Sequence, residues 1–558
     1  MRGISRAALV AGMSATTMLL ASCGGGGGDT GSGGGGATGG GSDAGKAGGE
    51  IVVRGCQPQN PLVGGDTGES CGHDIVELFT STLFRYDANT SEPKPDLAES
   101  VDSSDNQTFT VKLKKDRKFS DGTPVTAKSF VDAWNYTAYA PNGQYLSYFF
   151  EPIAGFKDLQ AEDPDGEDGP QKAPKPKADK MSGLKVIDDN TFEIKTTQPV
   201  SNLKVRLGYT AFAPQPESFF KDPKAFGDKP VGAGPYKVTS YEKGRQAVLE
   251  KNADYNGEFG GQVDKITFRI YQDQNAAYND LLAGNLDVID EMPAAAMVAK
   301  KYEGDLPDRW AQKPYGAIQT VTVAPDKVSP EYANPKLRQA ISMAIDRQKV
   351  INDQFDGARR PADGWAAPGV AGYKAGACGD FCTFDAAKAK ALFQEAGGFN
   401  GKLTISYNAD SDHKPWVTAT CNSIRSTLGV DCVATPVTDF ATFRDQIGQQ
   451  KMKGMFRSGW IMDYPHIENF LTPIFSKGAS SNDNRYDDPA FDAKLVEAGK
   501  LQGAESDAAY QEAEKMLAEK LPAIPMWYYT ATIGWSEKLN TVNINSFGRP
   551  DLLSVTVK

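Results

Sequence analysis

The sequence predicts an α/β protein with more than one lobe, on three observations. Two strand-like stretches, 403–407 and 430–433, flank a helix near residues 415–428, which makes a strand–helix–strand unit. The stretch 108–113 alternates apolar and polar residues with the period of two that half-buried strands show. The chain from about residue 50 to 558 is long enough for roughly two or three lobes, each with its own core.

The first 22 residues predict export from the cytoplasm. Arg2 and Arg6 form a charged beginning, and the apolar run 7–20 that follows is too short for a comfortable membrane span. The next residues, Leu20-Ala-Ser-Cys23, have the pattern of a lipobox. We therefore expect cleavage before Cys23 and lipidation of that cysteine, with several acyl chains giving a stable anchor.

Residues 23–49 follow as a tether, because they are mostly Gly, Ser, Ala, Thr and Asp and cannot form a core. The formal charge of the whole chain is −11, and loss of Arg2 and Arg6 with the signal peptide makes it two units more negative. This balance argues against nucleic acid as a partner and mildly favours cationic ligands.

Seven cysteines are present, and Cys23 is one of them. In an exported protein the other six are expected to form disulfides. Several connectivities are formally possible, and we favour the sequence-local one. With three histidines in the chain, none at a spacing that completes a ligand set, no metal site is expected. The favoured pairs are Cys56/Cys71, Cys378/Cys382 and Cys421/Cys432.

The remaining elements follow from the same patterns. Thr126 is a plausible N-cap for a helix over 126–135, and Pro335 lies in the first turn of an amphipathic helix predicted over 334–347. The acidic, proline-containing segment 158–180 is expected to be a solvated insertion. Further strands are expected at 50–54, 183–196, 237–241, 266–270, 284–289, 318–323 and 525–529, and further helices at 74–79, 275–282 and 507–519.

No catalytic set is evident in the sequence. The run 218–221 has a Ser-x-x-Lys pattern without the companion motifs of acyl-enzyme families, and 40–46 only imitates a phosphate-binding loop. Neither a nucleophile with its base and orienting group nor a cofactor loop can be assembled. We therefore predict that the protein is not an enzyme and needs no cofactor.

The stretch 457–471 combines features suited to an extended ligand. Gly459 leaves the backbone accessible, Trp460 supplies an apolar wall, and Asp463 precedes the turn at Tyr464-Pro465. Arg457 places a positive charge at the other end. A short peptide needs such a combination of charges, bare backbone and aromatic surface, although an ordinary strand and turn would share these features.

Motifs spread over the chain resemble the extracytoplasmic solute-binding proteins of peptide ABC importers, the oligopeptide/dipeptide-binding members of family 5. They occur in the family's order after the tether. Residues 60–62 and 132–135 resemble the actinobacterial oligopeptide-binding branch. The motifs are Leu97-Ala-Glu-Ser100, Phe119-Ser-Asp-Gly-Thr-Pro-Val-Thr126, Gly232-Ala-Gly-Pro-Tyr236, Gly284-Asn-Leu-Asp287, Leu337-Arg-Gln-Ala-Ile341 with Ile345-Asp-Arg347, and Gly459-Trp-x-x-Asp-Tyr-Pro465.

The resemblance implies an α/β two-lobed clamshell of the periplasmic-binding-protein type, class II, with an extra subdomain on lobe one. Closure of the lobes would bury the ligand, and the strands that cross between them would act as hinges. The implied divisions are 1–22 signal peptide, 23–49 lipidated cysteine and tether, 50–90 lobe one, 91–210 extra subdomain, 211–312 lobe one, 313–523 lobe two and 524–558 lobe one.

The resemblance also implies roles for individual residues. Main-chain pairing would tolerate many peptide sequences, since all peptides share the same backbone groups. Other interpretations stay open: Asp463 as a turn cap, Arg457 in a structural ion pair, Trp460 in the core and His413 at the surface. The implied ligand contacts are Asp463 with the α-ammonium group, Gly459 and Ile461 as strand edges, Trp460 as a pocket wall, Arg457 with a carboxylate, and His413 near the C-terminal end of the peptide.

The implied function is capture of short peptides outside the cell membrane and delivery to the permease subunits of an ABC transporter. The protein would be a monomer held to the membrane through lipidated Cys23. Alternatives are the same fold bound to an oligosaccharide, nickel or haem, or a peptide-sensing receptor.

Overall fold

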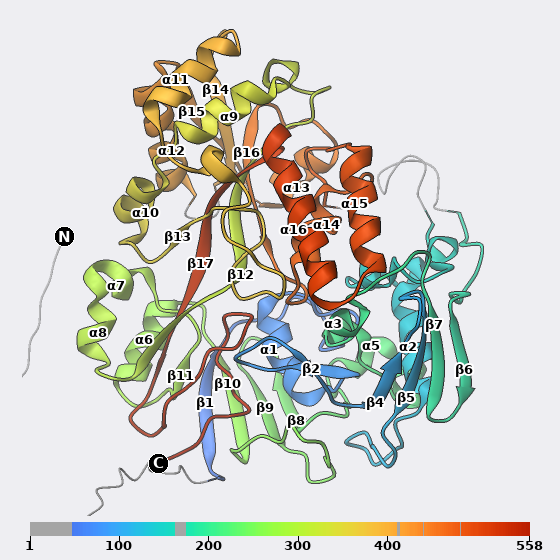
Figure 1. Ribbon diagram of the computed structural model, residues 1–558. Helices are drawn as coiled ribbons and strands as arrows, with labels where there is room; N and C mark the ends of the chain where they lie inside the picture. The colour runs from blue at the N-terminus through green and yellow to red at the C-terminus, as the bar shows by residue number, and fades with distance from the viewer. Residues whose placement is uncertain (1–46, 162–173, 410–412, 439, 480) are drawn as a thin grey trace, which may run out of the picture. The chain divides into compact units, whose positions relative to one another are not determined.

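The computed structural model describes residues 47–161, 174–409, 413–438, 440–479 and 481–558 (Figure 1). These residues belong to one unit, Gly45–Lys558. The predicted signal peptide, Cys23 and nearly all of the tether lie outside the described residues, as does the middle of the acidic insertion 158–180.

The largest sheet of the described residues has eleven strands and mixes parallel with antiparallel pairs (Figure 1). Its strands come from stretches far apart in sequence, between residues 50 and 535. In spatial order they are β15 (Cys432–Val437), β14 (Leu403–Asn408), β16 (Met455–Ile461), β12 (Trp310–Val323), β17 (Ala523–Trp535), β11 (Val288–Ile289), β1 (Glu50–Gly55), β10 (Lys265–Ile270), β9 (Gln246–Lys251) and β8 (Tyr236–Glu242), with β13 (Arg360–Pro361) beside β17.

The two long strands β12 and β17 connect the two ends of this sheet. They pair antiparallel with each other, and β12 pairs on its other side with β16. The C-terminal residues of β17, Gly534 and Trp535, pair with β11 as well, and Gly534 thus has β12 on one side and β11 on the other. Residues 316–323 of β12 are all buried, which suits a central strand covered on both faces.

A separate four-stranded antiparallel sheet lies within the range predicted for the extra subdomain; the boundaries themselves stay a prediction. Its order is β4 (Ala98–Asp102), β5 (Thr108–Leu113), β7 (Thr191–Lys195) and β6 (Leu184–Asp188). The prediction of one strand over 183–196 was wrong, because a turn at Asp189-Asn190 divides it into β6 and β7. A short hairpin joins β2 (Phe84–Tyr86) to β3 (Pro93–Pro95).

Helix ends follow local capping chemistry. Thr126 caps α2 (Ala127–Ala138) in a capping box with Ser129. The helix predicted over 334–347 is in fact two helices, α9 (Pro335–Met343) and α10 (Arg347–Phe355), because Asp346 accepts a hydrogen bond from the Lys349 N–H and starts the second.

The other helices have the following bounds: α1 (Ser70–Phe79), α3 (Leu203–Arg206), α4 (Glu217–Lys221), α5 (Pro223–Phe226), α6 (Gln274–Leu282), α7 (Ala294–Met297), α8 (Lys301–Asp305), α11 (Ala386–Glu395), α12 (Lys414–Leu428), α13 (Phe440–Gly448), α14 (Thr472–Phe475), α15 (Pro489–Lys500) and α16 (Gly503–Lys520). Short 3₁₀ helices include η2 (Ser147–Phe150) and η8 (Ile467–Phe470). Together with the strands they confirm the alternating α/β pattern predicted from the sequence.

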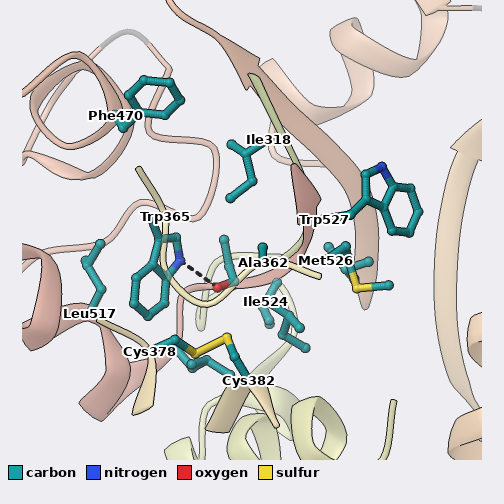
Figure 2. Packing of buried hydrophobic residues seen from close by; sticks show 14 of the residues in the cluster. Ile318, Ala362, Trp365, Cys378, Cys382, Phe470, Leu517, Ile524, Met526 and Trp527 are labelled. Atoms are coloured by element: carbon teal, nitrogen blue, oxygen red, sulfur yellow. Dashed lines mark hydrogen bonds between the residues drawn. A yellow bond between two sulfur atoms is a disulfide. The ribbon is translucent and has the colours of Figure 1, made fainter. Parts of the chain in front are cut away.

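The largest core cluster surrounds Trp365 and the inner strands of the large sheet (Figure 2). Trp365 is buried beside Ile524 and Leu517, and its indole N–H donates to the Ala523 carbonyl at 2.9 Å. Because the Trp365 ring is buried and its indole N–H is hydrogen-bonded, the loop 361–370 is held against β17. Since β17 neighbours β12 and β12 neighbours β16, this packing also supports the strand that carries the candidate site.

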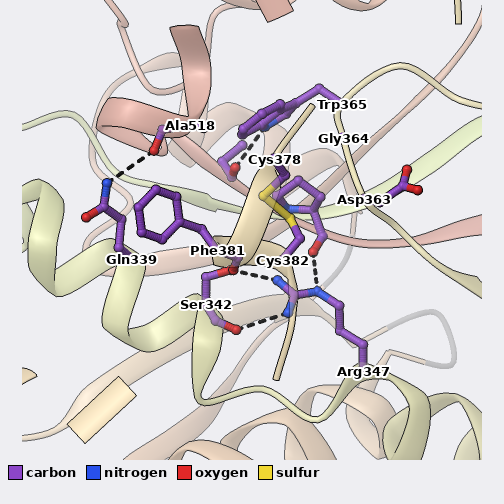
Figure 3. The surroundings of a disulfide bond; sticks show 12 residues. Gln339, Ser342, Arg347, Asp363, Gly364, Trp365, Cys378, Phe381, Cys382 and Ala518 are labelled. Atoms are coloured by element: carbon purple, nitrogen blue, oxygen red, sulfur yellow. Dashed lines mark hydrogen bonds between the residues drawn. A yellow bond between two sulfur atoms is a disulfide. The ribbon is translucent and has the colours of Figure 1, made fainter. Parts of the chain in front are cut away.

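The three predicted disulfides are present, with Cα–Cα distances of 5.1 Å for Cys56–Cys71, 5.7 Å for Cys378–Cys382 and 5.0 Å for Cys421–Cys432. Around Cys378–Cys382 the buried Arg347 donates to the Pro525 carbonyl at 2.7 Å and to the Ser342 hydroxyl at 2.7 Å (Figure 3). Burial lowers the pKa of Arg347 to about 9.

Candidate functional site

The candidate site begins at β16, one edge of which is covered along its whole length by β12. The hydrogen bonds from the Met462 N–H to the Gly316 carbonyl and from the Ala324 N–H to the Gly454 carbonyl, both 2.8 Å, mark the ends of this pairing. In an antiparallel pair, every second residue forms backbone hydrogen bonds with the partner strand. Met462 bonds to β12, and Gly459 and Ile461 are the alternate residues, so their N–H and C=O groups point to the opposite edge of β16.

That opposite edge is only partly covered in the described part of the chain. There β14 pairs in parallel with Met455 and Phe456, the first two residues of β16, and goes no further along it. Ile461 is 58% exposed and Gly459 is exposed too. An extended chain could therefore add to β16 here, since unpaired strand edges present a row of donors and acceptors.

Gly459 also has a structural reason to be glycine. A Cβ atom at this position would lie 2.7 Å from the Ile318 carbonyl oxygen of the neighbouring strand. The absent side chain thus lets β12 and β16 pack closely, as well as leaving the open edge bare.

The Trp460 side chain lines a pocket of about 400 Å³, a volume that includes the open space at the pocket's mouth. Ile318, Phe470 and Ile474 line the same pocket, so its walls are largely apolar. The indole N–H of Trp460 donates to the Asn469 side-chain oxygen at 2.9 Å, which holds the ring in place.

Asp463 follows β16 and is held by two hydrogen bonds to its carboxylate. Asn469 donates to one oxygen at 3.1 Å, and the Tyr148 hydroxyl donates to the other at 3.3 Å. The Asp463 N–H in turn donates to the Asn469 side-chain oxygen at 2.8 Å. Asn469, which is 1% exposed, therefore orients both Asp463 and Trp460.

Within the described residues the Asp463 carboxylate makes no ion pair, although the more distant charge of Arg206 acts on it. No Lys, Arg or His nitrogen of the described residues lies within 4.0 Å of it. Burial raises its pKa to about 6, which outweighs the lowering by the hydrogen bonds from Asn469 and Tyr148. A half-buried carboxylate in this state gains from a cation supplied by a ligand.

The two remaining predicted residues already have protein partners. The Arg457 guanidinium donates to the Asn408 side-chain oxygen at 2.8 Å and lies 5.3 Å from the centre of the Phe443 ring. His413 is the N-cap residue of α12, and its Nδ1 accepts a hydrogen bond from the Trp416 indole at 3.1 Å. The structure thus places Arg457, Gly459, Trp460, Ile461 and Asp463 along one strand and its end, and His413 on a different element.

Sequence reasoning missed Asn469 and Tyr148. Asn469 could have been considered, because it lies six residues after Asp463 within the stretch 457–471 that the sequence singled out. Tyr148 carries no such signal, since it lies 315 residues away in sequence and reaches Asp463 only through the fold.

Taken together, the site offers an open strand edge, an apolar pocket and an anchored carboxylate. These groups can hold an extended ligand with a positive end.

In the described residues, no cluster of His, Cys, Asp and Glu side chains is placed to bind a metal ion. No helix among the same residues is long and apolar enough to span a membrane.

The fold and this arrangement define a two-lobed α/β solute-binding protein. The solved structure of the murein tripeptide-binding protein MppA in its unliganded open form superposes with a TM-score of 0.74 at 23% identity, over 92% of this chain and 99% of that one. The structure of the binding protein DppA from Helicobacter pylori, in complex with the peptide STSA, gives a TM-score of 0.70 at 19% identity, with 92% and 98% covered.

A sequence model described as bacterial extracellular solute-binding proteins, family 5 Middle, matches residues 92–482. The periplasmic oligopeptide-binding protein OppA of Escherichia coli K12 is 28% identical over 458 residues, 78% of this chain and 79% of OppA. The chain therefore belongs to the bacterial extracellular solute-binding proteins of family 5, and this family and the two-lobed fold confirm what the sequence motifs predicted.

Proposed function

We propose that this protein captures short peptides outside the cell membrane and delivers them to an ABC importer. The peptide would add as a strand to the open edge of β16 beside Gly459 and Ile461, and its α-ammonium group would pair with Asp463. The Asp463 carboxylate, which makes no ion pair among the described residues and lies at the end of an open strand edge, is the observation that carries this proposal.

The two features together favour a peptide over other solutes. A strand edge recognises main-chain amides, which sugars, metals and haem lack. A carboxylate recognises a cation, and the N-terminus of a peptide puts one next to the first amide. Curated relatives with names such as oligopeptide-binding protein bind ligands of this kind, which supports the same class here.

The other predicted contacts belong to the same proposal. Trp460 would form one wall of the pocket for a side chain that points away from the strand edge. Arg457 would meet a carboxylate or an acidic side chain, and His413 would lie near the C-terminal end of the peptide.

Retention at the membrane is proposed through Cys23, with residues 23–49 as the tether between the lipid and the binding unit. The protein would act as a monomer that docks on the permease subunits of the transporter.

Native mass spectrometry of the purified protein, followed by release and sequencing of whatever co-purifies, tests the function directly. We expect a mixture of short peptides with free N-termini. An oligosaccharide, nickel or haem in their place would overturn the proposal.

A further inference from the structure

A second pocket is linked to Asp463 by a row of aromatic rings. It measures about 340 Å³, counting the space at its mouth, and its walls include His73, Tyr86, Tyr209 and Phe547. One acidic residue, Glu77 of α1, and one basic residue, Arg85, line it as well.

A row of aromatic rings leads from Asp463 into this pocket. Tyr148, whose hydroxyl donates to Asp463, lies 4.8 Å from the Phe149 ring, and Phe149 stacks on Tyr209 at 4.5 Å. Tyr209 in turn stacks on His73 at 5.1 Å. Tyr209 and Tyr86 are close enough to both Asp463 and Glu77 for each carboxylate to raise their pKa, after the larger effect of burial. Tyr209 thus lines the pocket together with Glu77 and belongs to the row of rings that begins at Asp463.

Within the described part of the chain, the Glu77 carboxylate makes no direct contact with a cation. In the described residues, neither an ion pair within 4.0 Å nor a hydrogen bond engages its carboxylate. Its pKa is raised by burial, although the charge of Arg85 opposes that effect. Like Asp463, it is a half-buried carboxylate, and it lines the pocket.

The nearby arginines are committed to other groups. Arg85 donates to the backbone carbonyls of Glu77 and Thr80, at 3.2 and 2.9 Å, and its Nε lies 3.7 Å from Asp96. Arg549 lies 3.3 Å from Asp290 and 3.6 Å from Asp74.

The third arginine, Arg54, pairs with Asp290 at 2.6 Å. Burial lowers the pKa of His73 to about 4, so this ring is neutral at pH 7 and does not repel a cation. The pocket thus joins a carboxylate that makes no ion pair among the described residues to aromatic faces, which attract ammonium and guanidinium groups.

We propose that this pocket takes a basic side chain, lysine- or arginine-like, from the N-terminal residue of the bound peptide, with Glu77 as its anion. This proposal rests on the proposed peptide-binding function. The ligand would then carry two neighbouring positive charges: its α-ammonium on Asp463 and its side chain on Glu77. The side chain nearest to the α-ammonium group is that of the first residue. Because the row of rings joins Asp463 to this pocket, we assign the pocket to the side chain of that residue.

The test compares matched peptides by isothermal titration calorimetry on the full chain. The first residue is arginine or its neutral isostere citrulline, and lysine or norleucine, followed by two or four alanines. We expect the basic peptides to bind the wild-type protein about tenfold or more tightly than their neutral partners. In Glu77→Gln this preference should vanish, while the neutral peptides keep their affinity.

The variant Glu92→Gln is the control, because it removes the same charge from an exposed position outside the pocket. It should preserve the preference. Equal affinity of arginine and citrulline peptides for the wild type would overturn the pocket assignment and leave the proposed function standing. A preference that persists in Glu77→Gln would overturn the role of Glu77. If no peptide of either length binds, the proposed function fails and this inference fails with it.

Discussion

Asp463 and Glu468 are two carboxylates five residues apart, and the fold treats them in opposite ways. Glu468 is 2% exposed and pairs with Arg206 at 2.8 Å, and it also accepts hydrogen bonds from Tyr464 at 2.5 Å and Asn202 at 2.9 Å. In the described part of the chain, the Asp463 carboxylate accepts hydrogen bonds from two neutral donors, Asn469 and Tyr148, and makes no ion pair.

The pKa values of the two carboxyl groups are shifted in opposite directions. For Glu468, burial alone would raise the pKa, but Arg206 and the hydrogen bonds outweigh it and lower the pKa below its ordinary value. For Asp463, burial prevails and the pKa rises to about 6. A carboxylate with its cation built in stabilises the protein, whereas one without a cation is available to a ligand. Four predictions test this contrast.

The largest effect is expected from Arg206→Met. It leaves the Glu468 charge buried without its cation and should reduce the free energy of unfolding by about 3–5 kcal/mol, measured by urea denaturation. The double variant Arg206→Met/Glu468→Met should recover most of the loss, because a buried pair is then replaced by apolar side chains. A single variant as stable as the wild type would show that Glu468 needs no cation.

Asp463→Asn should weaken peptide binding by about 2–5 kcal/mol, because the α-ammonium loses its anion. The free energy of unfolding should not fall, since the wild-type carboxylate is held at a raised pKa and the variant removes that cost. Calorimetry and urea denaturation on the same samples check both parts. Wild-type affinity in this variant would remove Asp463 from the binding site.

Peptide affinity should depend on pH through Asp463. A bound ammonium favours the ionised carboxylate and lowers its pKa in the complex, so affinity is full above pH 6 and falls as the pH drops below it. Below that point we expect roughly a tenfold loss per pH unit. Titrations between pH 4.5 and about 7.5 measure the slope. Asp463→Asn should be nearly flat over this range, and an equal slope in the variant would assign the effect to another group.

The smallest effect is expected from Arg457→Ala, because Asn408 and Phe443 already engage this side chain. We expect a change of about 1 kcal/mol or less in total affinity, together with a weaker preference for acidic or short peptides. Competition with a defined peptide library measures the ligand spectrum, and Arg457→Lys serves as the charge-preserving control. An unchanged spectrum in Arg457→Ala would exclude a ligand contact.

Local chemistry explains why much of the fold was predictable. The Thr126 cap and the alternation in β5 depend on neighbours in sequence, and so does the pairing of cysteines a few residues apart. The errors arose where a local signal was overlooked: the turn at Asp189-Asn190 and the Asp346 cap.

By itself the sequence determined the family motifs and the stretch 457–471, in which Asp463 was chosen as the ligand anchor. It could not show that Glu468 has a cation beside it while the Asp463 carboxylate makes no ion pair among the described residues. Their difference comes from Tyr148 and Arg206, which lie 315 and 262 residues away. The same holds for Glu77, whose pocket needs Tyr209 and Phe547 beside α1. The counter-ion of a buried charge is chosen by packing between distant segments, so only the tertiary structure decided which carboxylates remain available to a ligand.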